Sequence, residues 1–384
     1  MTLFFLLTLM PTFAAAQMAL QRLYKMPKAS LYVAGDPTHH LNENTARIPA
    51  STLKVLTALL ALKTWKPEHR FTTDFYVNAQ QQLTIKGYGD PYLTSEELDT
   101  IIFQLKQKGL TRINGLKMDN GYFVDNIAIS GRSKTNNPYD APLSALAINF
   151  NTLSVHRNKK GISSGESQTP LTPLMRTFAK QLPYGKHRVN LKKPAYASRY
   201  FAEVFRAKLR QKGIEVQGEI IEGAVDPTEV VFYQHINSKT LSETIAAMLK
   251  YSNNFIANQL FLMLGAEKYG APATIKKSQQ AYSEKIKQLF SWQKTFYEGA
   301  GLSRRNYLTA KELVEVLQQF APYKTLLKSQ NARILAKTGT LTGVSSYAGY
   351  LYNKNEWHAF ALLINQSVNG NFRKQVAKAL LDNE

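Results

Sequence analysis

"IPASTLKVLTALLALKTW", residues 48–65, places Ser51 and Lys54 three residues apart at the start of a long apolar segment. Residues at this spacing lie on one face of an α-helix, so the two side chains are expected to meet. The residues that follow are apolar all round the helix, which is typical of a helix buried on every side. Burial lowers the pKa of a lysine because it disfavours the charged amine. The pattern therefore predicts a neutral amine against a serine hydroxyl, the arrangement of a general base beside a nucleophile.

The same spacing occurs a second time, at Ser291 and Lys294 within "FSWQKTF". No long apolar helical run follows this copy, so we expect it to lie at the surface without a catalytic role. A single short motif is weak evidence by itself. The function of Ser51 and Lys54 has to be judged with the other motifs of the chain.

Length and composition restrict the class of protein. The chain has 384 residues, 44% of them hydrophobic, and this length predicts two domains, or one domain with an insertion. It contains no cysteine, which excludes disulfides and thiolate metal sites. Lys and Arg number 48 against 27 Asp and Glu, a formal net charge of +21. This excess predicts attraction to polyanions such as an anionic cell envelope. Nucleic acid is not an expected partner, because the basic residues occur along the whole chain and no nucleic-acid module is recognisable.

The N-terminus "MTLFFLLTLMPTFAAAQ" resembles a secretory signal, with an apolar run over residues 3–10 and a cleavage site after Ala16. Residues 1–16 are therefore predicted to be a signal peptide, and the protein is expected to be exported and periplasmic. No Lys or Arg precedes the apolar run, so a misplaced start or an uncleaved N-terminal arm stays open. The run is shorter than the ~20 residues that span a bilayer.

Hydrophobic periodicity predicts a mixed fold of helices and strands. Short strands and polar loops dominate from about residue 108 to 235, and the pattern then becomes strongly helical. The expected elements are a strand at 29–36, strands within 71–93, helices near 95–108 and 197–213, helices from about 241 to 320, three strands within 332–367 and a final helix over 371–382.

Two further motifs lie in the second half of the chain. "LKYSNNFIANQLFLML" (249–264) places Ser252 and Asn254 between two helical stretches, and "AKTGTLTGVSSYAGYL" (336–351) contains Lys337-Thr338-Gly339. Taken alone, the first is typical of a helix N-cap, and the second of an edge strand with a charged residue. Neither motif by itself predicts chemistry.

In this order, Ser-x-x-Lys, Ser-x-Asn and Lys-Thr-Gly are the motif set of the penicillin-interacting serine hydrolases. Ser51 and Ser252 are 201 residues apart, and Lys337 follows Ser252 by 85. The wide first gap resembles the class C low-molecular-mass penicillin-binding proteins, D-Ala-D-Ala carboxypeptidases and endopeptidases with extra domains between the first two motifs. The resemblance runs from about residue 29 to the end and includes "GYGDPYLTSEEL", "APLSALAINFN", "GAGLSRRNYLTAKEL" and "KTGTLTGVSSYAGYL".

The resemblance implies an α/β (α+β) fold. Its core is a β-lactamase/transpeptidase-like serine hydrolase domain with an antiparallel sheet flanked by helices. This discontinuous domain is predicted to comprise residues 17–82 and 236–384, with residues 83–235 as an inserted, mainly β accessory region. The insertion is expected to restrict which peptides reach Ser51 and to hold the polymeric substrate; alternatively, it only supports the catalytic domain.

The resemblance also implies roles for individual residues. Ser51 attacks a D-Ala-D-Ala carbonyl while Lys54 takes its proton, Ser252 relays a proton to the leaving amine, and Asn254 orients Lys54 and the substrate amide. Lys337 and Thr338 bind the terminal carboxylate. The strand at Gly339 pairs with the substrate backbone, and glycine there permits close approach of the ligand. The backbone N–H groups of Ser51 and Thr340 form the oxyanion hole. The partners are peptidoglycan stem peptides and β-lactam antibiotics, with no metal or organic cofactor.

The chain also departs from the family pattern. Glu298 and Ala300 stand where the family usually has Asp-Gly-Ser-Gly, and Asn258 stands where an acidic residue is frequent. Asp140 is a weak candidate for a substrate-binding acid. Two alternative functions stay open: a penicillin-binding envelope protein without catalysis, and a β-lactamase. The second is disfavoured because no dedicated deacylating glutamate is recognisable near the motifs.

Overall fold

Three stretches of chain that are far apart in sequence make up the first of two structural units. The computed structural model describes residues 10–36 and 38–382. The first unit combines the chain up to Leu60, residues Ile245–Ser252 and the chain from Lys285 onward. The second combines Ala61–Thr244 with Asn253–Glu284. Ser51, Ser252 and Lys337, one from each stretch, therefore belong to the same unit.

The first unit is built on an antiparallel sheet in the order β1-β15-β14-β13-β12. Three of its strands follow one another near the C-terminus, as predicted, and β1 from the N-terminal stretch pairs with β15. The strands span Ala29–Val33 (β1), Ser329–Asn331 (β12), Ile334–Leu341 (β13), Val344–Asn353 (β14) and Glu356–Ile364 (β15).

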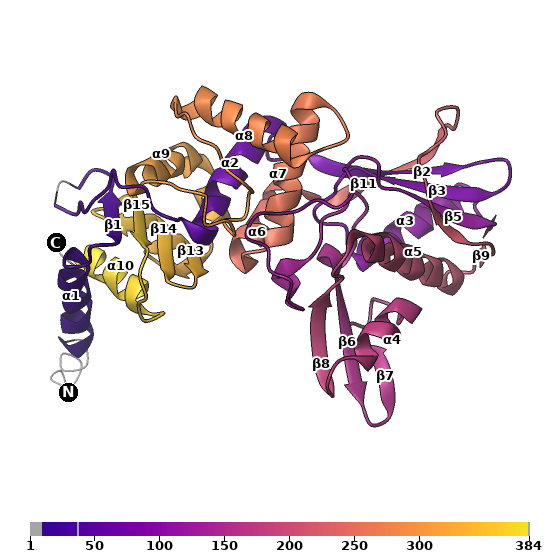
Figure 1. Ribbon diagram of the computed structural model, residues 1–384, viewed down its shortest axis with the longest axis horizontal. Helices are drawn as coiled ribbons and strands as arrows, with labels where there is room; N and C mark the ends of the chain where they lie inside the picture. The colour runs from indigo at the N-terminus through magenta and orange to yellow at the C-terminus, as the bar shows by residue number, and fades with distance from the viewer. Residues whose placement is uncertain (1–9, 37, 383–384) are drawn as a thin grey trace. The chain divides into compact units, whose positions relative to one another are not determined.

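Helices cover both faces of this sheet (Figure 1). α9 (Ala310–Phe320) packs on one face, α10 (Phe372–Asp382) on the other, and α1 (Met10–Tyr24) lies against α10. A capping box between Thr309 and Glu312 starts α9 and satisfies backbone N–H groups of its first turn. The sheet is thus enclosed between two helical layers, in agreement with the predicted antiparallel sheet flanked by helices.

The segment at residues 48–65 forms a buried helix, as predicted. A 3₁₀ turn at Ala50–Thr52 leads into α2 (Leu53–Trp65). Every side chain from Leu53 to Leu62 is at most 3% exposed. Three helices contain a division between the two units: α2, α6 (Leu241–Tyr251) and α8 (Ile275–Phe290).

The second unit contains a mixed sheet in the order β10-β5-β3-β2-β11, with α3 and α5 packed in the same apolar core. β2 pairs antiparallel with β3 and β11, whereas β5 pairs parallel with β3 and β10. At the end of the β2–β11 ladder, the backbone N–H of Leu241 donates to the carbonyl of His69 (2.7 Å). The elements are β2 (Arg70–Val77), β3 (Gln82–Gly87), α3 (Ser95–Gln107), β5 (Gly115–Asp119), α5 (Pro194–Gln211), β10 (Ile220–Glu222), β11 (Val231–Thr240), α7 (Asn254–Tyr269) and a short parallel pair, β4 (Arg112–Ile113) with β9 (Glu215–Val216).

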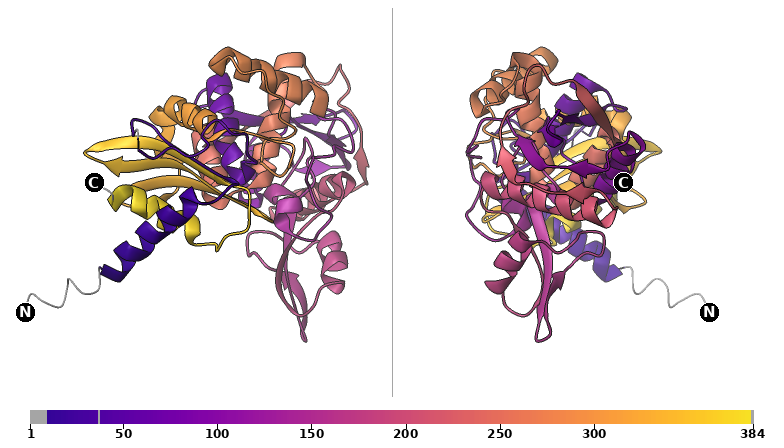
Figure 2. Two further views of the ribbon diagram at one scale, coloured as in Figure 1. Left: turned by 60° about the vertical axis from the view of Figure 1, so that its left-hand side comes forward. Right: turned by 90° about the vertical axis from the view of Figure 1, so that its right-hand side faces the viewer.

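A three-stranded antiparallel sheet extends from the rest of the second unit (Figure 2). It contains β6 (Thr152–Asn158), β7 (Gly161–Ser164) and β8 (Gly185–Asn190), with α4 (Pro173–Lys180) beside them. α4 was not predicted from the sequence and is only eight residues long. Its start nevertheless carries recognisable signals, an N-cap threonine followed by proline.

The predicted domain limits at residues 82/83 and 235/236 stay a prediction. β2 and β3, on either side of the first limit, pair over Thr73–Val77 and Leu83–Gly87, and β11 spans the second. The apolar run of the predicted signal peptide lies almost entirely outside the described residues. Within the described ranges, 10–36 and 38–382, no helix combines the length and apolar character needed to cross a bilayer.

Candidate active site

Ser51 and Lys54 meet at the start of α2. Lys54 Nζ lies 3.0 Å from Ser51 Oγ and donates to the carbonyl oxygen of Ala300 at 2.7 Å. The lysine side chain is completely buried, whereas Ser51 is partly exposed. The amine is therefore shielded from water while the hydroxyl beside it can be reached from outside.

The environment of Lys54 favours the neutral amine. Burial is the main cause that lowers its pKa well below the usual value, and the positive charge of Lys337 lowers it further. Glu298 acts in the opposite direction. A neutral amine within hydrogen-bonding distance of a hydroxyl can accept its proton, so the pair has the chemistry of a base and a nucleophile.

A turn built around Glu298 holds the carbonyl that contacts Lys54. The Glu298 carboxylate is fully buried and accepts hydrogen bonds from the Asn306 side chain and from the backbone N–H groups of residues 300, 301, 302 and 303. Thr57 Oγ1 donates to the carbonyl of Gly299 (2.6 Å), which ties α2 to the same turn. The residue that departs from the family pattern thus organises the carbonyl partner of Lys54.

Two glycines pack directly on the turn that carries Ser51. A Cβ at Gly301 would lie 1.9 Å from the carbonyl oxygen of Ala50, and a Cβ at Gly339 would lie 2.9 Å from Pro49 O and from Ser51 N. Both distances are too short for any side chain. The structure thus gives a reason for glycine at position 339 that involves only this chain's own atoms, and the expected close approach of a ligand to Gly339 stays a prediction.

Ser252 and Lys337 form a second pair in the same unit. Ser252 follows α6 with a left-handed φ of 54°, and its Oγ accepts a hydrogen bond from Lys337 Nζ at 2.9 Å. Lys337 also donates to the carbonyl of Thr338 (2.7 Å). Burial, with a contribution from the positive charge of Arg373, lowers the pKa of Lys337 to about 7. Lys337 can therefore both share a proton with Ser252 and carry charge near neutral pH.

Arg373 is a residue of this region that the sequence analysis missed. It lies in the first turn of α10, and its Nη1 donates to the carbonyl of Gly339 (2.8 Å) and to Thr340 Oγ1 (2.9 Å). Thr338 is partly exposed and Thr340 is exposed. No motif near Arg373 signals this position, because the contact depends on how α10 returns to β13.

Asn254 belongs to the second unit, unlike the other predicted site residues. It begins α7, and the N-cap of that helix is the preceding residue, Asn253, whose side chain accepts from Ile256 N. The Asn254 side-chain amide donates to the carbonyl of Tyr139 (3.3 Å). Its predicted role toward Lys54 stays a prediction.

Other candidates from the sequence have ordinary structural partners. Ser291 follows the end of α8 and is exposed, while Lys294 pairs with Glu312 (2.7 Å), as expected for a surface copy of the motif. Asp140 is buried and accepts hydrogen bonds from Ser133 N and Thr135 Oγ1 in its own loop. Among the residues that the structure describes, no cluster of three or more His, Asp or Glu side chains is arranged to hold a metal ion.

Together, these side chains provide the elements of acyl transfer by a serine hydrolase. The sequence matches the D-Ala-D-Ala carboxypeptidase 3 (S13) family over residues 33–182, 186–332 and 323–383. The chain belongs to this family, which confirms the resemblance to class C low-molecular-mass penicillin-binding proteins.

Individual relatives agree with this assignment. The chain is 25% identical to D-alanyl-D-alanine carboxypeptidase DacB of Haemophilus influenzae, over 88% of this chain and 85% of the relative. It is also 25% identical to the D-alanyl-D-alanine carboxypeptidase of Actinomadura sp. strain R39, over 83% and 73% of the two chains.

Solved structures share the fold. Penicillin binding protein 4 of Haemophilus influenzae has a TM-score of 0.77 at 22% identity, covering 96% of this chain and 98% of that protein. Bd3459 of Bdellovibrio bacteriovorus, described as a predatory peptidoglycan endopeptidase, has a TM-score of 0.52 at 16% identity, covering 93% and 92%. These likenesses confirm the predicted fold class.

Proposed function

We propose that this protein is a D-Ala-D-Ala carboxypeptidase of peptidoglycan stem peptides in which Ser51 is the nucleophile and Lys54 its general base. The enzyme class, a serine-type D-Ala-D-Ala peptidase, is that of the S13 family. The observation that carries the assignment of roles is the fully buried Lys54 amine 3.0 Å from the accessible Ser51 hydroxyl.

In the first step, Ser51 Oγ attacks the carbonyl carbon of the penultimate D-alanine and its proton passes to Lys54 Nζ. The carbonyl oxygen becomes an oxyanion and accepts hydrogen bonds from the backbone N–H groups of Ser51 and Thr340, by analogy with the family. Collapse of the tetrahedral intermediate breaks the C–N bond. The leaving D-alanine amine receives a proton from Ser252, whose hydroxyl regains one from Lys337, and Lys337 is reprotonated from solvent. Water then attacks the ester on Ser51. As the ester bond breaks, Ser51 Oγ takes back the proton held by Lys54, and the shortened peptide leaves after its new carboxyl group releases a proton to solvent.

The terminal carboxylate of the substrate is assigned to Lys337 and Thr338. This assignment is supported by the position of both residues on β13 and by a lysine pKa of about 7, which permits a positive charge at neutral pH. Arg373 adds a second cation beside Gly339 and Thr340. Asn254 is assigned to the substrate amide because it belongs to the Ser-x-Asn motif.

Carboxypeptidase activity is favoured over endopeptidase activity by the description of the family and of two relatives. Endopeptidase activity is a second candidate, because Bd3459 is described as a peptidoglycan endopeptidase and has the same fold. Acylation by β-lactams is part of the proposal, and it is supported by a solved structure of Bd3459 acylated by penicillin G. Non-catalytic binding is disfavoured because all three motifs retain their reactive side chains.

The proposed location is the periplasm. It is supported by the signal-like residues 1–16 and by a substrate that belongs to the cell wall. The formal net charge of +21 further supports a peripheral association with anionic envelope surfaces.

The test is acylation by benzylpenicillin, followed by intact mass spectrometry and peptide mapping. We expect one adduct, on the peptide that contains Ser51, and no adduct in Ser51→Ala. Ser291→Ala is the matched control, because it removes the serine of the second Ser-x-x-Lys and should leave the adduct unchanged. An adduct that persists in Ser51→Ala contradicts the assignment. Incubation with purified peptidoglycan then separates the activities, since free D-alanine reports the carboxypeptidase and split crosslinks report the endopeptidase.

A further inference from the structure

The second unit contains a hollow of about 260 Å³ that the proposed chemistry does not use. Its walls come from α4, the end of β8, the first two turns of α5 and the connector of residues 132–140. None of the predicted site residues lines it. Its volume is near the lower limit of typical small-molecule sites, so it suits one ring or one short side chain of a larger ligand.

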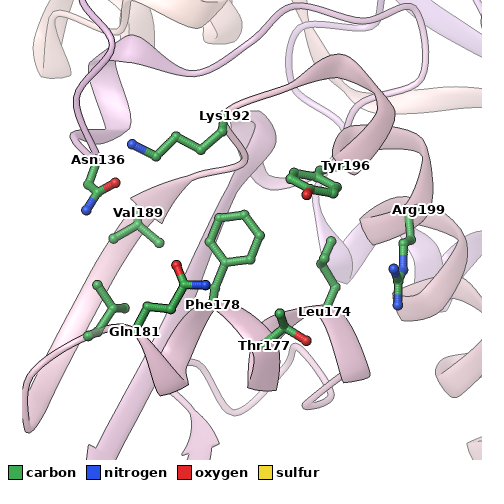
Figure 3. Close-up of a pocket in the computed structure, with 10 residues that line it drawn as sticks. Asn136, Leu174, Thr177, Phe178, Gln181, Val189, Lys192, Tyr196 and Arg199 are labelled. Carbon is green, nitrogen blue, oxygen red and sulfur yellow. The ribbon is translucent and has the colours of Figure 1, made fainter.

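Two aromatic rings form the apolar part of the hollow. Phe178 of α4 and Tyr196 of α5 are 5.7 Å apart between ring centroids and meet edge to face at 84°. Figure 3 shows Phe178 in the middle of the lining residues, with Tyr196, Lys192 and the Gln181 amide around it. Both rings are half-buried, so together they offer a fixed apolar surface against which a ligand can pack.

Polar groups with free hydrogen-bonding capacity surround these rings. In the part of the chain that the structure describes, no protein group hydrogen-bonds the side-chain amides of Asn136 and Gln181. Lys192 uses one N–H to reach the carbonyl of Thr135 (2.8 Å), and Arg199 uses one to reach Glu203 (2.7 Å). Lysine has three N–H donors and arginine five. The hollow thus combines two aromatic rings, two side-chain amides that can both donate and accept hydrogen bonds, and two positively charged side chains.

The surrounding chain is strongly basic. Residues 132–212 contain 16 Lys and Arg but only 3 Asp and Glu, against 48 and 27 in the whole chain. Two of these three carboxylates are already paired, Glu166 with Arg188 and Glu203 with Arg199, and the third, Asp140, is buried. A ligand that carries repeated carboxylates is therefore attracted to this part of the second unit.

The shape of the hollow distinguishes three classes of ligand that a basic surface could attract. Single-stranded nucleic acid binds along open grooves that follow several nucleotides, whereas this hollow of about 260 Å³ has room for a single ring. A membrane surface binds amphipathic helices that insert an apolar face, whereas the aromatic ring of α4 is directed into the hollow. An N-acetylated sugar presents an apolar ring face and an amide, which match the rings and the side-chain amides here.

We propose that this hollow binds an acetamido sugar of the peptidoglycan glycan strand, with the carboxylates of attached stem peptides paired to Lys192 and Arg199. The inference rests on the proposed function, because peptidoglycan is the polymer on which the enzyme acts. The inserted region was expected to hold the polymeric substrate, and this hollow is the site at which it would do so.

Within the second unit, the connector of residues 132–140 links this hollow to Asn254. Asn136 lines the hollow, and the side chain of Asn190 donates to the carbonyls of Thr135 (2.8 Å) and Asn137 (2.7 Å). Three residues after Asn136, the carbonyl of Tyr139 accepts a hydrogen bond from Asn254. A sugar seated against Asn136 thus contacts the same short connector as the first residue of α7.

The experiment measures binding of the reducing disaccharide of peptidoglycan, with and without its tetrapeptide, by NMR titration of the full chain. We expect Gln181→Ala and Tyr196→Ala to weaken binding of both ligands by about fivefold or more, since each removes one contact of typical strength. Arg199→Gln is expected to weaken only the peptide-bearing ligand. Lys160→Gln, which removes one exposed charge from the β6–β7 turn, is the matched control and should stay within about twofold of wild type.

Several outcomes overturn the proposal. One is equal affinity in all variants; another is an equal loss in Lys160→Gln and Arg199→Gln, which would reduce the effect to net charge. A DNA oligonucleotide or a phosphatidylglycerol vesicle that loses binding in Gln181→Ala and Tyr196→Ala as the disaccharide does would also overturn it. Thermal unfolding checks each variant, and Gln181, being exposed, still tests the proposal if Tyr196→Ala unfolds.

Penicillin acylation distinguishes this inference from the proposed function. Acylation of Ser51 should be unchanged in all four variants, because none of them touches the motif residues. A wild-type protein that binds the disaccharide without being acylated refutes the proposed function and leaves the sugar site intact. A protein that is acylated normally but binds neither ligand refutes the sugar site alone.

Discussion

Substitution of Gly301 by alanine is expected to damage acylation far more than it damages folding. A Cβ at this position would lie 1.9 Å from Ala50 O and 3.1 Å from Ser51 N, whereas ordinary contacts begin at 3.4 Å. The Ala50 carbonyl must therefore move by about 1.5 Å, or Gly301 must retreat by the same amount. Ala50 already has a left-handed φ of 48°, so the turn has little freedom to adjust.

Movement of the Ala50 carbonyl displaces Ser51, the residue bonded to it, and sets the expected magnitude. Misplacement of a reacting group by about 1 Å can lower a rate by roughly 10²-fold. The φ of Gly301 is 81°, so alanine also loses roughly 1–2 kcal/mol of stability from the left-handed backbone. The second-order rate constant for acylation by benzylpenicillin should fall by about 10²-fold or more, while the folded state is retained.

Gly343 provides a matched control for this experiment. It lies in the turn between β13 and β14 with a φ of 71°, and a Cβ there would meet no atom within 4 Å. Gly343→Ala should lose the same backbone contribution to the free energy of unfolding but keep its acylation rate. A folded Gly301→Ala that is acylated within about threefold of Gly343→Ala would refute the claim that this glycine positions Ser51.

Three other predictions concern the same chemistry and the accessory sheet. Lys54→Arg should lower acylation by at least about 10²-fold because arginine does not release its proton, and Lys337→Arg should lose less; equal losses contradict this division of roles. Acylation should rise with pH as Lys54 becomes neutral. In contrast, kcat/KM for a D-Ala-D-Ala peptide should fall above about pH 7, because Lys337 loses its positive charge there. This alkaline fall should disappear in Lys337→Arg. Replacing residues 83–235 by a Gly/Ser linker should prevent folding, because β2 loses its partner strand β3. Removing only residues 154–188, whose ends pair with each other, should leave acylation by penicillin measurable. Circular dichroism reports folding of both variants, and mass spectrometry reports their acylation.

The elements that local sequence patterns encode could be predicted. The buried helix at Ser51, the strands near the C-terminus and the break between helices at Ser252 each follow from periodicity and from helix-ending residues nearby. The motif order could be matched to a family because its reactive side chains are few and fixed in type. α4 was missed because eight residues hold little periodic signal.

Contacts between distant segments could not be predicted in the same way. Arg373 reaches Gly339 from another element, and nothing in the local sequence of α10 shows which strand it meets. Glu298 was recognised as a departure from the family pattern, but its structural role was missed. That role depends on the backbone N–H groups that surround its carboxylate only in the folded chain. The concentration of basic residues in 132–212 could have been found from the sequence by counting in windows.

The ladder between β2 and β11 has a consequence for how quickly the chain can assemble Ser51 with Ser252. The open loop between these serines is 201 residues long. Once Arg70 pairs with Thr240 and His69 with Leu241, the path between the two serines that still has to close shortens to about 30 residues. Because closure entropy grows with the logarithm of loop length, this lowers the cost of closure by roughly 2 kcal/mol. We therefore expect the second unit to fold first and to shorten the loop that must close between Ser51 and Ser252. Mutations that weaken the β2–β11 ladder should then slow the appearance of penicillin-reactive enzyme during refolding.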